Sequence, residues 1–306
     1  MSDLSVSAQT RLLVVAPHPD DETLGCGVLI QRVLAAGGAV QVLLLTDGDN
    51  NPWPQRYIER RLRIDAAGRR RWGGRRRGEV LQAIAALGLP ASALHAMGWP
   101  DMGLTALLRD EGSRAIAAVQ AVMQGFQPNL VSCPGLRDSH PDHGAAHVLC
   151  CLALAGLDRP PSLFAYPVHG HADASAYPVL VDAAPGQQQR KLQALAEHVT
   201  QMRLSGARLR RLALSPERYM QVERAPGAAR LPWRPPVLLQ PWLRLLAATP
   251  AGAVDFRWPD AVVSAAGGGY QFRWPPGRQP PGPAFVKLHL DWPSPWIFDH
   301  WGWHAV

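Results

Sequence analysis

Residues 11–24 read Arg-Leu-Leu-Val-Val-Ala-Pro-His-Pro-Asp-Asp-Glu-Thr-Leu, an apolar run that ends abruptly in a polar cluster. The first six residues are rich in aliphatic and β-branched side chains, which predicts a strand of a buried parallel sheet. An apolar-periodic stretch over residues 24–36 follows and ends at Gly37-Gly38, as expected of a helix. The order of strand, polar turn and helix is typical of an α/β fold.

The same alternation continues along the chain. Further elements are predicted at residues 40–46 (strand), 79–87 (helix), 113–124 (helix), 130–133 (strand) and 144–157 (helix). We therefore expect a Rossmann-like α/β fold, with a mostly parallel sheet and helices on both faces. Ligands of such folds bind outside the carboxyl ends of the strands, which is where the polar clusters of this sequence fall.

The composition changes near residue 223, where a segment rich in proline and tryptophan begins. Short runs at residues 254–258, 270–274 and 285–290 are separated by proline and glycine, which predicts strands joined by turns. We expect one domain over residues 1–223 and a β-rich C-terminal extension over residues 224–306.

Two polar clusters carry side chains that bind metals. The first, at residues 18–22, reads His-Pro-Asp-Asp-Glu, and the second, at residues 138–143, reads Asp-Ser-His-Pro-Asp-His. Imidazole nitrogens and carboxylate oxygens are ligands for Zn²⁺, and three such ligands leave an open position for water. A carboxylate beside that position can act as a general base. The alternative is that the first cluster caps a helix, because aspartate is a favoured N-cap residue, and that the second spacing is incidental.

The charge is concentrated in one segment. The chain has a formal net charge of +7, and residues 56–77 include ten arginines. Such a run can bind nucleic acid, an anionic lipid surface or an anionic substrate, or it can be a solvated surface. The four cysteines form no Cys-x-x-Cys pair, which argues against a thiolate zinc site. No apolar stretch predicts a transmembrane helix or a secretory signal, so we expect a cytoplasmic protein.

Residues 16–27, Ala-Pro-His-Pro-Asp-Asp-Glu-Thr-Leu-Gly-Cys-Gly, resemble the N-terminal signature of the LmbE / PIG-L family of zinc deacetylases. His-Pro-Asp-His at residues 140–143 resembles the second signature of that family. Residues 191–201 are similar to its late helix, with Thr-Gln where the family usually has Ser-Gln. The resemblance covers residues 10–223 and leaves the C-terminal extension without a counterpart.

The resemblance implies a metal site and a base. It implies Zn²⁺, or another divalent ion in its place, bound by His18, Asp21 and His143. It implies Asp20 as the general base.

The resemblance also implies roles around the substrate. His140 is expected to be the oxyanion or general-acid group, steered by Asp142. Arg76 and Asp101 are expected to grip the sugar, and the other arginines of the basic segment are expected to be mostly solvated.

The expected function is a zinc-dependent hydrolase that removes an N-acyl group, above all N-acetyl, from an N-acetylglucosamine-type amino sugar or its conjugate. One alternative is a zinc amidase that acts on a larger acyl group or a thiol-conjugate amide. An alternative of another class is an arginine-rich nucleic-acid-binding α/β protein, which would leave both metal-like clusters unexplained. We expect a small amino-sugar substrate and no nucleic-acid partner, and the sequence indicates no oligomeric state.

Overall fold

The computed structural model describes residues 4–169, 175–223, 230–260, 263–266, 269–274, 281–292 and 299–306. The chain forms two compact units, each built from separate stretches of sequence. The first unit comprises Met1–Gly103, Phe126–Pro134 and Pro161–Val222, and the second comprises Leu104–Gly125, Gly135–Pro160 and Glu223–Val306. The domain boundary between residues 223 and 224 stays a prediction.

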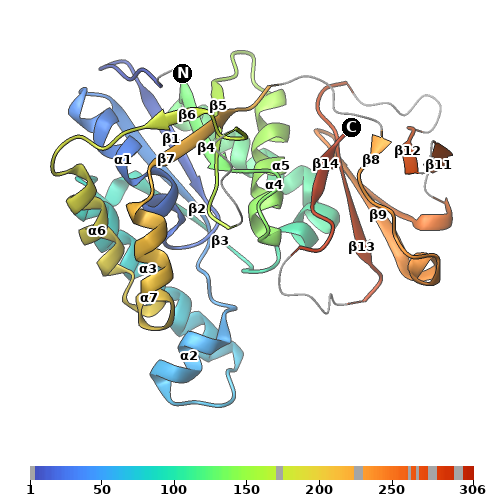
Figure 1. Cartoon of the computed structure of the whole chain (residues 1–306), viewed down its shortest axis with the longest axis horizontal. Helices are drawn as coiled ribbons and strands as arrows, with labels where there is room; N and C mark the ends of the chain where they lie inside the picture. Colours follow the sequence, from blue (N-terminus) through green and yellow to red (C-terminus); the bar gives the residue numbers. More distant parts are fainter. Residues whose placement is uncertain are drawn as a thin grey trace. The chain divides into compact units, whose positions relative to one another are not determined.

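The first unit is an α/β layer structure around one seven-stranded sheet (Figure 1). The strand order is β3-β2-β1-β4-β5-β7-β6, and the pairs from β3 to β5 are all parallel. β7 pairs antiparallel with both β5 and β6. The elements of this unit are β1 (Arg11–Ala16), α1 (Asp21–Ala35), β2 (Ala39–Thr46), α2 (Pro52–Glu59), α3 (Ala66–Ala86), a 3₁₀ turn (Ala91–Ala93), β3 (Leu94–Trp99), β4 (Leu130–Pro134), β5 (Ser162–Tyr166), β6 (Val179–Val181), α6 (Gln187–Glu197), α7 (Val199–Leu214) and β7 (Glu217–Gln221).

The centre of the sheet positions the first polar cluster. β1 lies between β2 and β4, so the chain order of the strands reverses beside β1. Leu12 to Ala16 are fully buried, which explains why this strand is a continuous apolar run. The carboxyl end of the strand at such a reversal is the usual place for a ligand in an open α/β sheet.

A close contact explains the glycine in the signature that follows. A Cβ atom on Gly25 would lie 2.3 Å from the ring of Tyr166, so only glycine lets α1 approach β5 this closely. The Tyr166 hydroxyl donates a hydrogen bond to the Val15 carbonyl at 2.8 Å and ties the same region to β1.

Several elements of the first unit were shortened or missed by the sequence prediction, and α3 and β3 are two of them. The helix predicted at residues 79–87 is part of α3, which begins thirteen residues earlier and contains most of the basic segment. Asp65 caps its start by accepting a hydrogen bond from the Gly68 amide at 2.7 Å. β3 was not predicted, because this edge strand is largely half-buried or exposed and lacks an apolar run.

The second unit combines two helices with antiparallel strands. β9 lies between β10 and β13 in a four-stranded sheet, and a smaller sheet has the order β11-β12-β8. Its core includes Trp233 and Trp258, so tryptophans of this segment pack against aliphatic side chains. The elements are α4 (Leu104–Phe126), α5 (Pro141–Ala155), β8 (Arg230–Leu231), a 3₁₀ helix (Val237–Trp242), β9 (Leu243–Thr249), β10 (Gly252–Arg257), a 3₁₀ turn (Trp258–Asp260), β11 (Val263–Ala266), β12 (Gly269–Phe272), β13 (Phe285–Leu290) and β14 (Trp303–Ala305).

The predicted fold class is confirmed: the chain has a mostly parallel α/β sheet and antiparallel strands in its C-terminal part. Helices on both faces of the sheet stay a prediction, since α4 and α5 belong to the second unit. Among the described residues, no helix is both long enough and apolar enough to cross a bilayer. The cytoplasmic location stays a prediction.

Candidate metal and catalytic site

The turn after β1 holds the first polar cluster in a strained conformation. Asp20 has φ 113° and ψ −23°, a left-handed conformation that non-glycine residues rarely adopt. Its amide donates a hydrogen bond to Glu22 Oε2 at 3.1 Å, which holds the turn in place. Such strain persists only where surrounding contacts enforce it, and it concentrates at functional sites.

The ring of His18 has a carboxylate at each nitrogen. Its Nδ1 lies 3.3 Å from Asp21 Oδ2, and its Nε2 lies 3.2 Å from Asp101 Oδ1. Asp101 Oδ2 also accepts a hydrogen bond from the Asn50 amide at 2.7 Å. Two ligands of one tetrahedral zinc with bonds of about 2.0–2.2 Å lie about 3.4 Å apart, so the His18–Asp21 pair fits neighbouring zinc ligands. Asp101 then resembles the carboxylate that orients a metal-binding histidine from its other nitrogen.

The Asp20 carboxyl group lies beside the Asp21 carboxylate. Burial and the neighbouring Asp21 carboxylate raise the pKa of Asp20 to about 6, although Arg76 and His198 oppose the shift. A carboxylate with a pKa close to neutrality is a better proton acceptor than an ordinary aspartate. This arrangement suits Asp20 as the base and leaves Asp21 beside His18.

Arg76 is buried and binds the backbone of two loops. Its guanidinium donates to the Pro19 carbonyl and to the Gly48 carbonyl, each at 2.7 Å. A Cβ atom on Gly48, which has φ +61°, would lie 1.7 Å from Arg76 Nη1, so this loop requires glycine. Arg76 therefore fixes the segments that follow β1 and β2. The neighbouring Arg75 and the triplet at residues 69–71 are exposed.

A buried pair, Glu22 and His198, supports the turn that follows β1. The sequence analysis gave neither residue a role. His198 Nε2 lies 2.9 Å from Glu22 Oε1, and both side chains are fully buried. Burial opposes ionisation of both groups, but their mutual attraction prevails: the pKa of Glu22 is lowered and the pKa of His198 is raised. His198 lies at the junction of α6 and α7, and Thr23 also donates to Glu22 at 2.6 Å.

His198→Gln is expected to lower stability in a pH-dependent way. The raised pKa of His198 gives stability that is present below about pH 6.5 and lost as pH rises through the folded pKa. The lowered pKa of Glu22 gives stability that is present above about pH 4.5 and lost as pH falls through the folded pKa. The other charged groups facing His198 are Asp20 and Arg76, which act in opposite directions.

The deficit of the variant should therefore be largest between about pH 4.5 and 6.5, on the order of 1–3 kcal/mol for a charged buried hydrogen bond. Denaturant unfolding of metal-free wild type and variant at pH 5.5 and pH 9 measures it. An equal deficit at both pH values would contradict the ion pair.

The second polar cluster lies around the start of α5 in the second unit. The Asp142 amide donates to His140 Nδ1 at 3.2 Å, so His140 caps the helix through its side chain. Because Nδ1 accepts this hydrogen bond, the neutral ring carries its proton on Nε2 and can donate from there. The Asp142 carboxylate accepts from the Leu104 amide at 3.0 Å.

His143 is fully buried and faces a carboxylate from the same cluster. Its Nδ1 lies 3.2 Å from Asp138 Oδ2, and Asp138 Oδ1 accepts a hydrogen bond from the His140 amide at 3.0 Å. A carboxylate at one ring nitrogen is the usual support of a histidine that binds a metal through the other. Asp138 was part of the quoted cluster, but the sequence analysis assigned it no role.

Part of the chain is similar to a known protein family. Residues 13–154 match the PIG-L family, described as GlcNAc-PI de-N-acetylase. This match covers slightly less than half of the chain. The resemblance predicted from the two signatures is confirmed. The PIG-L domain match includes both polar clusters and ends within α5.

Relatives of this chain include proteins named as deacetylases. One is 1D-myo-inositol 2-acetamido-2-deoxy-alpha-D-glucopyranoside deacetylase of Rhodococcus opacus, which is 32% identical over 169 residues. The match covers 50% of this chain and 57% of that relative, so the chain spans little more than half the length of the curated relative.

Solved structures support the fold. N,N'-diacetylchitobiose deacetylase from Pyrococcus horikoshii has a TM-score of 0.55 at 20% identity, with 70% of this chain and 84% of that chain covered. The conserved protein TT1542 from Thermus thermophilus has a TM-score of 0.51 at 27% identity, with 74% and 99% covered.

Proposed function

We propose that this protein is a zinc-dependent N-deacetylase that hydrolyses the acetamide of an N-acetylglucosamine-type sugar or sugar conjugate. The observation that carries the proposal is the His18–Asp21 pair, held by Asp101 at the carboxyl end of β1 within the residues that match the PIG-L family. The named activity of the Rhodococcus relative, which acts on an acetamido sugar linked to inositol, supports the substrate class.

His18, Asp21 and His143 are proposed as the zinc ligands, with another divalent ion as an option. The strand order supports a shared site, because β1 and β4 are adjacent and parallel and both clusters follow their carboxyl ends. Eight residues lie between Pro134, the end of β4, and His143, a span that can reach at most about 30 Å. The donor set of two imidazoles and one carboxylate matches hydrolytic zinc sites.

The remaining side chains suit amide hydrolysis. Zinc supplies Lewis-acid activation of water and of the amide carbonyl. Asp20, with its raised pKa, accepts the proton of the attacking water and then donates it to the nitrogen of the leaving amine. His140 donates a hydrogen bond from Nε2 to the developing oxyanion, and its helix-capping Nδ1 favours this role over that of a cationic general acid.

Asp101 and Arg76 stay proposals as residues that act on the substrate, but their contacts indicate that they position other parts of the site. Asp101 uses both carboxylate oxygens, on His18 and on the Asn50 amide, so we propose it as a positioning residue for His18 that lies beside the substrate. Arg76 holds the Pro19 and Gly48 carbonyls, so its effect on the sugar is exerted through the loops. Asp142 as the residue that steers His140 also stays a proposal.

A substrate panel tests the function and its closest alternative. Free-amine release is measured for N-acetylglucosamine, its inositol conjugate, and analogues with butyryl or longer acyl groups. We expect release of acetate from an acetamido sugar to be fastest. Turnover confined to longer acyl or thiol-conjugate amides would favour the zinc amidase, and the absence of any amide hydrolysis by the metal-loaded protein would contradict both.

A further inference from the structure

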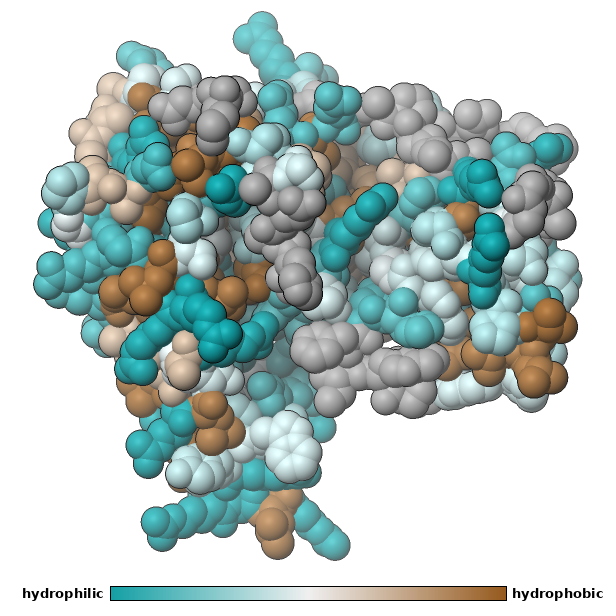
Figure 2. Space-filling view, viewed as in Figure 1, coloured by the Kyte–Doolittle hydropathy of each residue, from teal (hydrophilic) through white to brown (hydrophobic). Residues whose placement is uncertain are grey.

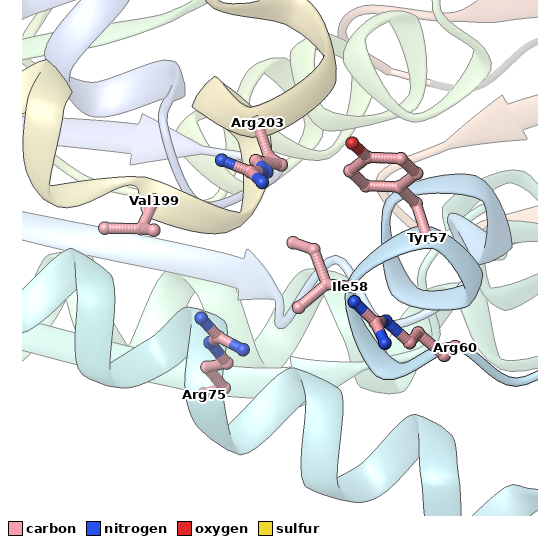
Figure 3. Close-up of a pocket in the computed structure, with 6 residues that line it drawn as sticks. All are labelled: Tyr57, Ile58, Arg60, Arg75, Val199 and Arg203. Carbon is pink, nitrogen blue, oxygen red and sulfur yellow. The ribbon is translucent and has the colours of Figure 1, made fainter.

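A pocket lies in the first unit, apart from the two polar clusters described above. It has a volume of about 400 Å³ and is lined by Tyr57, Ile58, Arg60, Arg75, Val199 and Arg203. These residues come from α2 and its carboxyl end, from α3 and from the start of α7, and Figure 3 shows their side chains around a common space. Over α2, Figure 2 shows mostly hydrophilic side chains with a few apolar ones among them.

The three guanidinium groups of the pocket are poorly compensated. Among the described residues, Arg60 and Arg203 have no carboxylate within ion-pair distance, and Arg203 lies only over the Tyr57 ring, at 5.8 Å from its centroid. Arg75 Nε is 3.6 Å from Glu79 Oε1, a long contact. None of the described residues that line the pocket is acidic.

The Glu79 carboxylate is already used by another residue. It accepts hydrogen bonds from the Thr200 amide at 3.1 Å and from the Thr200 hydroxyl at 2.6 Å. Arg75 therefore keeps most of its hydrogen-bonding capacity. All three arginines are exposed, so solvent screens their mutual repulsion, and an anion bound among them reduces it further.

The backbone at Arg60 adds an independent observation. Arg60 ends α2 with φ 52° and ψ 42°, the left-handed conformation that usually favours glycine or asparagine at a helix end. An arginine in that conformation costs backbone energy, and strain of this kind concentrates at ligand-binding sites. The Arg60 side chain lines the pocket.

We propose that this pocket binds the phosphate group of an organic phosphate. Guanidinium groups form bidentate, charge-assisted hydrogen bonds with phosphate oxygens, and three of them can serve three oxygens. The half-exposed Val199 and the exposed Tyr57 ring provide apolar contact for the organic part. The phosphate belongs either to a soluble ester or to a lipid headgroup, and the proposal does not depend on the deacetylase function.

The binding test uses phenyl phosphate and inorganic phosphate as probes, with isothermal titration calorimetry of the full chain. Phenyl phosphate is expected to bind with one site per chain and more tightly than inorganic phosphate. Arg60→Gln/Arg203→Gln should weaken it at least tenfold, because two charge-assisted contacts are lost. The matched control, Arg69→Gln/Arg70→Gln, removes the same charge from exposed positions of α3 outside the pocket and should change the affinity less than twofold.

A second arm distinguishes the source of the phosphate. Co-sedimentation with vesicles of phosphatidylglycerol and phosphatidylcholine, compared with vesicles of phosphatidylcholine alone, measures headgroup binding. Wild type, the pocket variant and the matched control are compared in one buffer at one salt concentration. Binding to the anionic vesicles that only the pocket variant loses supports a lipid headgroup, and phenyl phosphate binding without vesicle binding supports a soluble ester.

Two results would overturn the proposal. One is the absence of saturable binding of either probe to a wild-type protein whose circular dichroism shows it is folded. The other is an equal loss of phenyl phosphate affinity in the pocket variant and in the matched control. If binding also depended steeply on salt, and a single-stranded oligonucleotide bound as tightly as phenyl phosphate, the attraction would be a diffuse one for polyanions.

Discussion

Asp20→Asn is expected to keep the metal and lose most of the turnover, by about 10²–10⁴-fold, because general-base catalysis typically supplies that factor. Asparagine preserves the shape and the strained turn, whose amide contact to Glu22 is made by the backbone. The carboxylate with its pKa near 6 is what the substitution removes. Free-amine release and zinc content are measured on the same preparation.

The neighbouring substitution provides the control. Asp21→Asn removes a proposed ligand that lies 3.3 Å from His18 Nδ1, so metal affinity should fall first and added zinc should restore part of the activity. Asp20→Asn should not respond to added zinc. The reverse pattern would exchange the roles assigned to the two aspartates.

His143→Ala is expected to have the other large effect, with loss of bound zinc and a fall of activity to background. Removal of one of three protein ligands leaves two, and catalytic zinc sites use three. His147→Ala is the matched control, since this buried histidine is one turn later on α5 and packs edge-on against Phe285. The control should keep its zinc.

Asp138→Asn is a milder test of the proposal that His143 binds zinc. If Asp138 orients His143 across 3.2 Å, its substitution should weaken zinc affinity by about 10–100-fold without abolishing it. A competition titration with a chelator measures the affinity. Full zinc content in His143→Ala would show that the ligand set is wrong.

The local parts of the site could be predicted from the sequence. Strand β1 is a buried apolar run, and the turn that follows carries its chemistry within five residues, so both features are visible in one short stretch. The same holds for residues 138–143, where the supporting carboxylate and the two histidines are neighbours in sequence.

The supporting contacts could not be predicted, because they are tertiary. His198 meets Glu22 across 176 positions of sequence, and Arg76 meets the Pro19 carbonyl across 57. A single buried histidine and one arginine among ten carry no local signal of such contacts. The start of α3 could not be predicted either, because the glycines and arginines of residues 68–78 form no apolar stripe.

Metal reconstitution tests the central claim most directly. The protein is freed of metal by a chelator, dialysed, and titrated with Zn²⁺ while free-amine release from an N-acetylglucosamine conjugate is recorded. The account predicts no turnover without metal and a linear recovery that ends at one zinc per chain. Full deacetylation by protein shown by elemental analysis to be metal-free, or recovery that is identical in His143→Ala, would contradict it.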